Sequence, residues 1–432
     1  GVATADTRTV NNFKAERNGF DLERLEKLAT YLDDQVESGV LPNAAVYIWR
    51  NGKLVWGLKA GYLDIQSKRP IRNDTLFRMF SMTKPITAAA VMLLVDDGLV
   101  LLDEPLSLYL PEFKEMQVLV PSSTGEYVLE PASQPIRVRD LLTHTAGLSY
   151  NFIPTPVAAD YVRLGIEPGN PVPTNDQHQS LQSMVEAVAT LPLVTQPGSS
   201  WHYSVSLDVA GRLIEVVTGQ RFEEFLHQRL LRPLKMVDTD FQVQPPVARE
   251  KLTALYAFPP ANAPSGTPLQ LMDPVQEVSG WVIPPKVVSG GGGLVGTGAD
   301  YMNFAVMLLN KGRFKGQQIL SRRASEQMLT NQMSPEYGTA KNPWPSFMNT
   351  DVSVSGVGHG LGGAVYLDYG LSDLPLTPGS YTWGGAAGTL FWVDPEKDMA
   401  VVFLTQVLEL GEGKTEALQG RMVNLVYQAL ED

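Results

Sequence analysis

Apolar and polar positions alternate with two periodicities along this chain, one typical of helices and one typical of strands. From residue 22 to 36, apolar residues recur every three or four positions and Gly39 follows, which predicts an amphipathic helix that ends there. Residues 44–50 and 53–58 have the composition of strands, and Asn51-Gly52 between them is typical of a two-residue hairpin turn. Helix, strand, turn and strand in this order indicate an antiparallel sheet with a helix packed on it.

The last third of the chain returns to the strand pattern. The predicted strands there are 360–368, 381–385, 389–393 and 399–406. Residues 394–398 have the composition of a turn before the last of these strands, and a final helix is expected over 415–430. Residues 1–20, by contrast, look like a polar arm.

The middle of the chain, from about residue 99 to 285, contains many prolines, short helices and long connections. The helices expected before and within it are 81–97, 137–148, 205–217 and 222–231. Residues 151–178 include five prolines and two glycines, which predicts an irregular loop. Loops of this length usually form a wall or lid of a functional site.

A chain of 432 residues exceeds what one core usually holds, so two domains are expected. We predict an α/β fold in which residues 1–80 and 288–432 form an antiparallel sheet flanked by helices. Residues 81–287 would form a second, mostly helical domain. The active site would lie between the two.

The net charge of −12 argues against nucleic acid and anionic membrane as partners, because both bind to basic surfaces. No apolar run is long enough to span a bilayer. The first residues show neither the basic nor the apolar region of a signal peptide, which favours the cytoplasm. The oligomeric state stays open between monomer and homodimer.

Cysteine is absent, which excludes disulfides, thiolate metal sites and a cysteine nucleophile. The five histidines show no H-E-x-x-H motif and no close pairing, so neither a metal nor another cofactor is expected. His202, beside Tyr203, is the one histidine considered as a participant in chemistry.

Residues 289–296 formally contain G-x-G-x-x-G, but no convincing strand or βαβ unit surrounds them. We interpret this glycine run as a backbone turn into a helix near Ala299.

The strongest candidate chemistry lies where the helix over 81–97 begins. Ser81 and Lys84 are three residues apart and therefore lie on one face of a helix. Serine needs an adjacent base to act as a nucleophile, and a partly buried lysine can supply one because burial disfavours the charged amine. The pair forms an S-x-x-K signature. The alternative is a serine that only caps the helix.

Two further motifs could complete this site. Tyr203, in Trp-His-Tyr-Ser-Val before a helix, could present its phenol to the serine and pass a proton to a leaving group. The alternative is an ordinary tyrosine at a helix boundary. Trp383 is followed by two glycines in an otherwise apolar strand, which indicates close approach of a ligand or another backbone. We expect an edge strand whose N–H groups could face an oxyanion, with a packed β-bulge as the alternative.

The order of S-x-x-K, a tyrosine and a glycine-containing strand near the C-terminus resembles the serine β-lactamase-like superfamily. The nearest likeness is to the family VIII carboxylesterases, which look like class C β-lactamases. The resemblance runs from about residue 40 to the end and includes 137–148, 197–205 and 383–388. It implies the fold of that superfamily. It also implies a carboxylesterase that hydrolyses short- to medium-chain carboxylic esters through an acyl-enzyme.

Carried onto this sequence, the resemblance implies Ser81 as the acylated nucleophile, Lys84 as its base and Tyr203 as the catalytic tyrosine. The oxyanion hole would consist of the backbone N–H groups of Ser81 and Ala386. The expected substrate-binding residues are Tyr150, Trp383, Gly384 and Gly385.

Two departures from the β-lactamase pattern affect the expected substrate. Related β-lactamases carry Tyr-x-Asn, whereas Val205 takes the place of that amide here. Their strand motif is Lys-Thr-Gly, which offers a cation and a hydroxyl to the β-lactam carboxylate. Trp383 and Gly384 offer neither, so the site favours neutral esters, unless a lysine or arginine from 151–178 supplies the contact to an anion.

The alternative functions are a β-lactamase with promiscuous esterase activity and an acyltransferase that uses the same acyl-serine. A binding module with an inactive site is a third alternative, but the intact Ser81, Lys84 and Tyr203 argue against it. No G-x-S-x-G motif is present, so the nucleophile-elbow type of hydrolase is excluded. Asp140 is interpreted as a structural hydrogen-bond partner.

Overall fold

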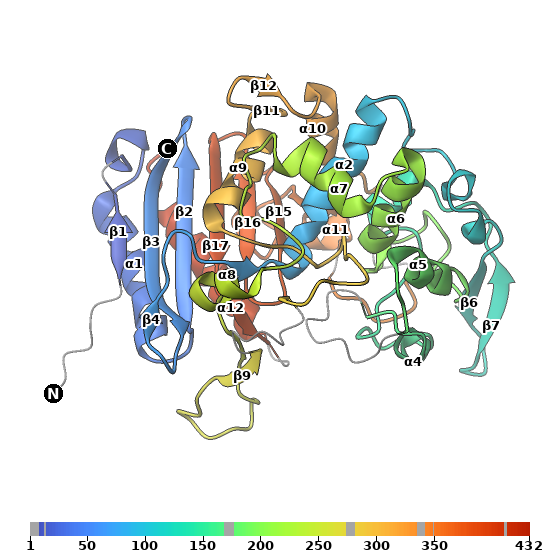
Figure 1. Ribbon diagram of the computed structural model, residues 1–432, viewed down its shortest axis with the longest axis horizontal. Coiled ribbons are helices and arrows are strands. Elements are labelled where there is room, and N and C mark those ends of the chain that lie inside the picture. The colour runs from blue at the N-terminus through green and yellow to red at the C-terminus, as the bar shows by residue number, and fades with distance from the viewer. Residues whose placement is uncertain are drawn as a thin grey trace.

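The computed structural model describes residues 8–12, 14–167, 177–273, 281–334, 342–348, 350–409 and 413–432. Its main feature is an antiparallel sheet with the strand order β1-β3-β2-β17-β16-β15-β14-β13, and β4 pairs with β3 (Figure 1). These strands are β1 (Thr9–Asn11), β2 (Asn43–Arg50), β3 (Lys53–Asp64), β4 (Arg69–Pro70), β13 (Val357–His359), β14 (Ala364–Tyr366), β15 (Tyr381–Gly384), β16 (Leu390–Asp394) and β17 (Met399–Leu404).

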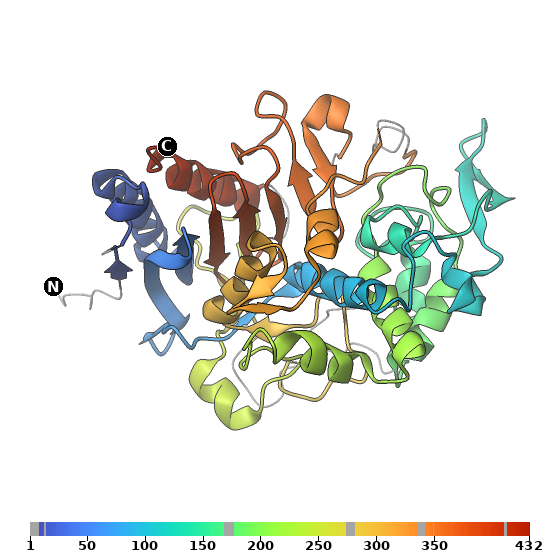
Figure 2. The same ribbon diagram turned by 90° about the horizontal axis from the view of Figure 1, so that it is seen from above.

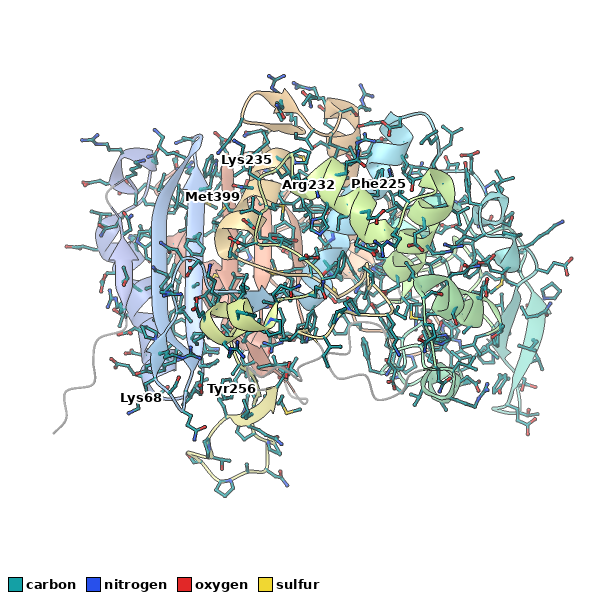
Figure 3. All side chains as sticks on the ribbon, viewed as in Figure 1. Lys68, Phe225, Arg232, Lys235, Tyr256 and Met399 are labelled. Atoms are coloured by element: carbon teal, nitrogen blue, oxygen red, sulfur yellow. The ribbon has the colours of Figure 1, made fainter. Side chains whose placement is uncertain are left out.

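Helices cover both faces of this sheet. α1 (Leu22–Glu37) packs with α12 (Lys414–Gln428) on one face, and α9 (Gly298–Leu309) packs on the other, as Figure 2 shows from above. All six residues of β17 are buried. Met399, labelled in Figure 3, is the first of them. A strand covered on both faces needs apolar residues on both, which explains why β17 is a continuous apolar run.

α2 (Thr83–Asp96) separates the sheet from a group of short helices (Figure 1). Residues 83–94 of α2 are buried all round the helix, because it packs against elements on both sides, including α6 and α10. The other helices are α3 (Val138–Leu142), α4 (Ala158–Arg163), α5 (Leu181–Ala189), α6 (Ser206–Thr218), α7 (Phe222–Leu226), α8 (Pro245–Lys251), α10 (Arg322–Met328) and α11 (Val352–Ser355).

Short strands form small sheets beside the main one. The pairs are β5 (Phe77–Arg78) with β10 (Val295–Gly296), β6 (Gln117–Pro121) with β7 (Tyr127–Pro131), β11 (Arg313–Phe314) with β12 (Gln317–Gln318), and β8 (Leu255–Ala257) with both β9 (Gln270–Asp273) and β18 (Val407–Leu408). No helix in the described ranges is both long and apolar enough to cross a membrane.

The predicted antiparallel sheet flanked by helices is confirmed. The helix after residue 22, the hairpin at Asn51-Gly52, the three strands after residue 381 and the last helix lie within a few residues of their expected bounds. The glycine run at 289–296 is a turn that leads through β10 into α9, as expected. The division into two domains stays a prediction, and β8 and β9, from the middle of the chain, pair with β18 near its end.

Three expectations about local structure are wrong. Within the supposed polar arm, β1 pairs with β3 at the edge of the sheet, and so short and polar a strand has no hydrophobic pattern to reveal it. Residues 360–368 are not one strand: residues 360–363 form a turn between β13 and β14, and the strand β14 covers only 364–366. Gly362 has a φ of +81° in this turn, and a Cβ there would lie 2.4 Å from Ala88 of α2. The loop 151–178 contains α4, and its residues 168–176 lie outside the described ranges.

A buried ion pair holds the segment that leads to Ser81. The Arg78 guanidinium, with no exposed side-chain surface, donates to Asp273 of β9 at 2.9 Å and to the carbonyl of Thr253 at 2.7 Å. The side chain of Gln406 accepts from the backbone N–H of Arg78 at 2.9 Å and returns a bond to its carbonyl at 3.2 Å. These contacts join three distant parts of the chain directly before the nucleophile candidate.

Three buried histidines lie where the sheet and the helices meet. His144, His202 and His359 are at most 1% exposed, and the rings of His144 and His359 are 5.4 Å apart. Burial lowers the pKa of His202 to about 4 and that of His359 to about 3. Burial, together with the neighbouring His359 and Lys84, also lowers the pKa of His144 well below its usual value. The folded protein therefore holds all three as neutral rings near neutral pH.

Replacing Arg78 with methionine is expected to destabilise the protein by about 3–5 kcal/mol, because it removes the cation of a buried ion pair. Arg163→Met is the control, since its pair with Asp160 is exposed and should contribute at most about 1 kcal/mol. Urea unfolding of both variants measures the difference. Equal stabilities of the two variants would contradict this role of the ion pair.

Stability is expected to fall as the pH drops below about 6.5. The unfolded chain then binds protons at histidines that the folded protein keeps neutral, so the free energy of unfolding decreases until the folded pKa is reached. For His202, with a folded pKa of about 4, the loss at pH 5 is at most about 2 kcal/mol. Denaturant unfolding at pH 7 and pH 5 should show a smaller loss for His202→Gln than for the wild type. Equal losses in the two proteins would contradict the assignment.

Candidate active site

Ser81 lies in a tight turn that precedes α2. A single 3₁₀ turn, Phe80–Met82, leads into the helix, and Phe80 has a φ of +46°, which non-glycine residues seldom adopt. The ring of Phe80 packs edge-on against Trp281 at 5.4 Å and so occupies a fixed place. Met82 is the N-cap residue of α2 and makes no side-chain cap bond. Ser81 is therefore not the helix cap that was the alternative interpretation.

The structure brings the three predicted catalytic side chains together. The hydroxyl oxygens of Ser81 and Tyr203 are 2.6 Å apart, although 122 residues separate them in sequence. The Lys84 ammonium donates to the Ser81 hydroxyl at 3.1 Å. A serine within hydrogen-bond distance of both a lysine and a tyrosine has the geometry of an activated nucleophile.

Lys84 is held by neutral groups. Its side chain is 1% exposed, and its Nζ donates to the carbonyl of Gly291 at 2.8 Å. The same atom lies 4.7 Å from the ring centre of Tyr203 and 5.1 Å from that of Tyr150, distances typical of cation–π contacts. Among the described residues, no carboxylate lies within ion-pair distance of Lys84. The lysine is thus positioned by a carbonyl and two ring faces.

Asp208 fixes the backbone that receives Lys84. This carboxyl, on α6, is fully buried and accepts hydrogen bonds from the Ser289 hydroxyl at 2.5 Å and from the Gly291 N–H at 3.3 Å. Its other oxygen has no partner within the described ranges, and burial raises its pKa. A Cβ on Gly291 would lie 2.4 Å from that oxygen, so the close approach requires glycine. The sequence analysis missed Asp208, whose position among the buried residues of an apolar helix was the available indication.

Aromatic rings surround Tyr203. The ring centres within 6 Å of its own belong to His144, Phe347, Tyr150, Trp383 and Trp201. Tyr150, an expected pocket residue, is 5% exposed, and its pKa is raised well above the usual value by burial and by the neighbouring Tyr203. The hydroxyl of Tyr203, with Ser81 and Lys84, is therefore a polar group surrounded by mostly apolar rings.

β15, the strand that leads to the predicted oxyanion donor Ala386, is an edge strand only in its second half. β15 pairs with β16 along its length and with β14 at Tyr381 and Thr382, so the expected edge strand is wrong for its first half. Trp383 and Gly384 pair on one side only. A Cβ on Gly385 would lie 2.5 Å from the carbonyl of Met79, which explains this glycine by close approach to the turn before Ser81. Whether substrate binds along this strand stays a prediction.

The two predicted oxyanion donors have free N–H groups. Within the described residues, neither the backbone N–H of Ser81 nor that of Ala386 donates to a protein acceptor. Ala386 is exposed in the turn that follows β15. Both groups can therefore bind a ligand oxygen, as the prediction requires.

Three residues considered for the anion contact of β-lactamases do not supply it. Val205 is fully buried at the start of α6. Arg163 is the single lysine or arginine of the loop 151–178, and it pairs with Asp160 at 3.0 Å. His202, the other polar candidate, bonds to Ser149 at 2.9 Å and Asn342 at 2.7 Å rather than to Ser81.

A segment that the sequence analysis did not consider crosses to this site. Residues 342–348 precede α11, and Asn342 donates to the Nδ1 of His202, while the Trp344 indole donates to the carbonyl of Val194 at 2.8 Å. These bonds place the ring of Phe347 on that of Tyr203, with centres 5.0 Å apart and planes at 26°. The Pro-Trp-Pro-Ser-Phe composition was the only indication in the sequence.

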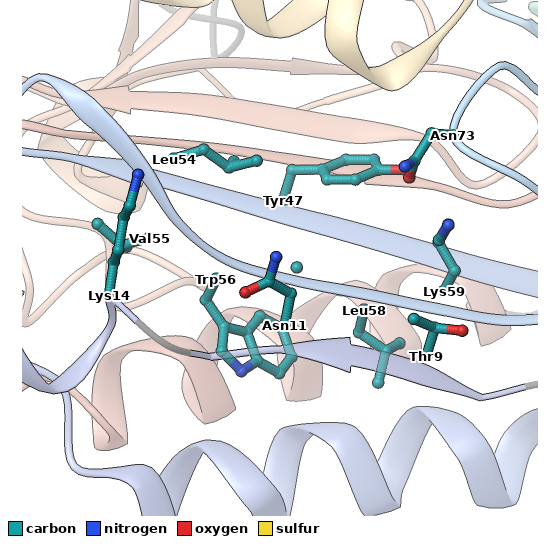
Figure 4. A pocket seen from close by; sticks show the side chains of 11 residues that line it. Thr9, Asn11, Lys14, Tyr47, Leu54, Val55, Trp56, Leu58, Lys59 and Asn73 are labelled. Carbon is teal, nitrogen blue, oxygen red and sulfur yellow. The ribbon is translucent and has the colours of Figure 1, made fainter.

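Other features lie outside this site. Asp140 is fully buried and accepts from the Arg137 N–H and the Thr145 hydroxyl, each at 2.8 Å, which fits a structural partner. A hollow of about 260 Å³ at the β1–β3 edge is lined by residues such as Tyr47 and Trp56 and by none of the predicted site residues (Figure 4). No cluster of three potential metal ligands occurs in the described part of the chain.

Comparisons with known proteins agree with this geometry. The chain is 33% identical to Protein Rv1367c of Mycobacterium tuberculosis (strain ATCC 25618 / H37Rv), over 86% of this chain and 87% of that protein. It is 31% identical to the lovastatin esterase of Penicillium rubens (strain ATCC 28089 / DSM 1075 / NRRL 1951 / Wisconsin 54-1255), over 83% of this chain and 86% of that protein.

Among solved structures, the model resembles EstCE1, described as a hydrolase with promiscuous acyltransferase activity. The two share 26% sequence identity and a TM-score of 0.74, over 94% of this chain and 99% of that chain. The Beta-lactamase family model matches residues 28–421. The chain therefore belongs to the beta-lactamase family and has the serine β-lactamase-like fold that its resemblance to family VIII carboxylesterases implied.

Proposed function

We propose that this protein is a serine carboxylesterase of the family VIII type that hydrolyses short- to medium-chain carboxylic esters. One observation carries the proposal: the Ser81 hydroxyl lies within hydrogen-bond distance of both the Tyr203 hydroxyl, at 2.6 Å, and the Nζ of Lys84, at 3.1 Å. Nucleophilic catalysis by serine requires this proximity of a group that can take its proton. A small-molecule ester is accordingly the proposed partner.

In the first step, the Ser81 oxygen attacks the ester carbonyl, and its proton passes to Lys84, directly or through the Tyr203 hydroxyl, with Lys84 acting as the base in its amine form. The N–H groups of Ser81 and Ala386 donate to the oxyanion that forms. Tyr203 then returns the proton to the leaving alcohol oxygen, and the carbon–oxygen bond to the alcohol breaks. In the second step, water attacks the acyl-serine with the same pair as base, which releases the acid and restores the serine.

The composition of the site supports a neutral ester over a β-lactam. A β-lactam carries a carboxylate, and burying an unpaired anion is costly. Val205 and Trp383 supply no amide or cation for it, and Arg163 is already paired with Asp160. The net charge of −12 adds a general repulsion of anions.

Acyl transfer to an alcohol is the second candidate function. EstCE1, which shares the fold at 26% identity, is described as a hydrolase with promiscuous acyltransferase activity. The rings around Tyr203 reduce the space for bulk water beside the serine. An alcohol that binds there would compete with water for the acyl-enzyme.

Replacing Ser81 with alanine is expected to lower kcat for p-nitrophenyl butyrate by at least about 10³-fold, and Tyr203→Phe by about 10²–10³-fold, because such residues act as a unit. Ser38→Ala, at an exposed serine next to α1, is the control and should keep the wild-type rate. Steady-state kinetics at pH 8 measures the three variants. A Ser81→Ala protein that retains a tenth of the wild-type rate would contradict the proposal.

Replacing Asp208 with asparagine is expected to lower kcat by about 10–100-fold with little change in KM, because a neutral amide oxygen accepts the two bonds that fix the carbonyl opposite Lys84 more weakly than a carboxylate does. Asp300→Asn is the matched control: this carboxyl is also buried, but it accepts from Thr239 and the backbone of Asp238 away from the serine. The control should lose stability and keep kcat. Equal effects of the two variants on kcat would show that Asp208 has no positioning role.

A further inference from the structure

Two large aromatic side chains at the candidate active site are exposed. Phe347 is 60% and Phe152 is 58% exposed. Single exposed apolar residues are common on protein surfaces and need no explanation. These two differ, because they end one continuous series of ring contacts that runs from Phe152 through Tyr150 and Tyr203 to Phe347. The series has its centre at the hydroxyl that contacts Ser81.

Phe347 is held in place rather than exposed by chance. Its segment, residues 342–348, is bound to the helical side of the molecule through Asn342 and Trp344, whose partners are His202 and the carbonyl of Val194. One face of its ring stacks on Tyr203 with centres 5.0 Å apart. Since the side chain is still 60% exposed, a large apolar surface remains open directly beside the reacting groups.

We propose that Phe347 forms the binding site for the alcohol part of the substrate, and that this part is an aryl or other large neutral apolar group. The inference rests on the proposed function, in which Tyr203 protonates the leaving alcohol. The alcohol oxygen must then lie at the Tyr203 hydroxyl, 2.6 Å from the Ser81 oxygen. Of the rings within 6 Å of Tyr203 in the described residues, Phe347 is the exposed one, so the group attached to that oxygen extends beside Phe347. Aromatic pairs at such distances stabilise each other beyond simple burial.

The polar surroundings exclude a charged alcohol. Lys84 is bound to the Gly291 carbonyl and Ser81, and Arg163 to Asp160, so neither is placed to pair with an anionic alcohol. Among the described residues, Lys84 makes no ion pair with a carboxylate, and the carboxyl of Asp208 is fully buried and does not reach a cationic alcohol. The site that Phe347 forms therefore selects by shape and apolar surface.

The same site serves an alcohol that attacks the acyl-enzyme, because transfer is the reverse of acylation. The alcohol oxygen bonds to the acyl carbon, the bond from that carbon to the Ser81 oxygen breaks, and the alcohol proton passes through Tyr203 to the serine. Atoms and charge balance without any further reactant. An arylalkyl alcohol such as benzyl alcohol should therefore compete with water better than methanol does.

The test separates the two halves of the ester. kcat/KM is measured for methyl acetate, benzyl acetate, with the ring on the alcohol, and methyl phenylacetate, with the ring on the acid. Phe347→Ala is expected to lower the benzyl acetate to methyl acetate ratio about tenfold, and to change the methyl phenylacetate to methyl acetate ratio less than twofold. Tyr369→Ala is the matched control, at a 58% exposed ring that contacts no aromatic ring of the site in the described residues, and should leave both ratios unchanged.

An unchanged benzyl acetate ratio in Phe347→Ala, or an equal fall of the methyl phenylacetate ratio, would overturn the inference while leaving the esterase proposal intact. A wild-type protein that hydrolyses none of the three esters would overturn the proposed function and the inference together. Melting temperatures of the variants, expected to lie within about 2 °C of the wild type for exposed side chains, confirm that the comparison is made on folded protein.

Discussion

The hydroxyl of Ser81 is shared between two groups that reach it from different parts of the fold, and this contact constrains the rest of the structure. Lys84 lies in the first turn of α2, directly after the 3₁₀ turn that holds Ser81, whereas Tyr203 lies 122 residues away, just before α6. To bring them within hydrogen-bond distance, α2 must be buried along its length between the sheet and α6. Arg78, before the serine, and Asp208, behind the lysine, then hold each side of the contact in place.

Local patterns were sufficient to predict most of the fold. Helices with a clear apolar face, such as α1 and α6, and the hairpin at Asn51-Gly52 follow from rules that depend only on neighbouring residues. β1 and the turn between β13 and β14 could not be found in this way. A three-residue edge strand is defined by its partner β3, and the glycines of the turn are explained by close approach to distant residues: Gly360 to Met328 of α10, Gly362 to Ala88 of α2 and Gly363 to Tyr381 of β15.

The residues of the candidate site that belong to sequence motifs were predictable. The residues whose roles arise from packing in the folded chain were not. Ser81, Lys84 and Tyr203 have recognisable neighbours in sequence, and the structure places them together. Asp208 and Phe347 have no motif, because their roles arise from contacts with residues 289–291 and with Tyr203 that only the folded chain creates. Membership of the beta-lactamase family agrees with the first group and says nothing about the second.

The central claim is that Ser81 becomes acylated during turnover, and intact mass spectrometry tests it most directly. The protein is mixed with p-nitrophenyl butyrate, quenched in acid within milliseconds to seconds, and weighed, and the modified peptide is then sequenced. The account predicts a transient mass increase of one butyryl group on the peptide that contains Ser81, and none in Ser81→Ala. An acyl group on another residue, or ester turnover with no adduct at any quench time and an unaffected Ser81→Ala protein, would contradict it.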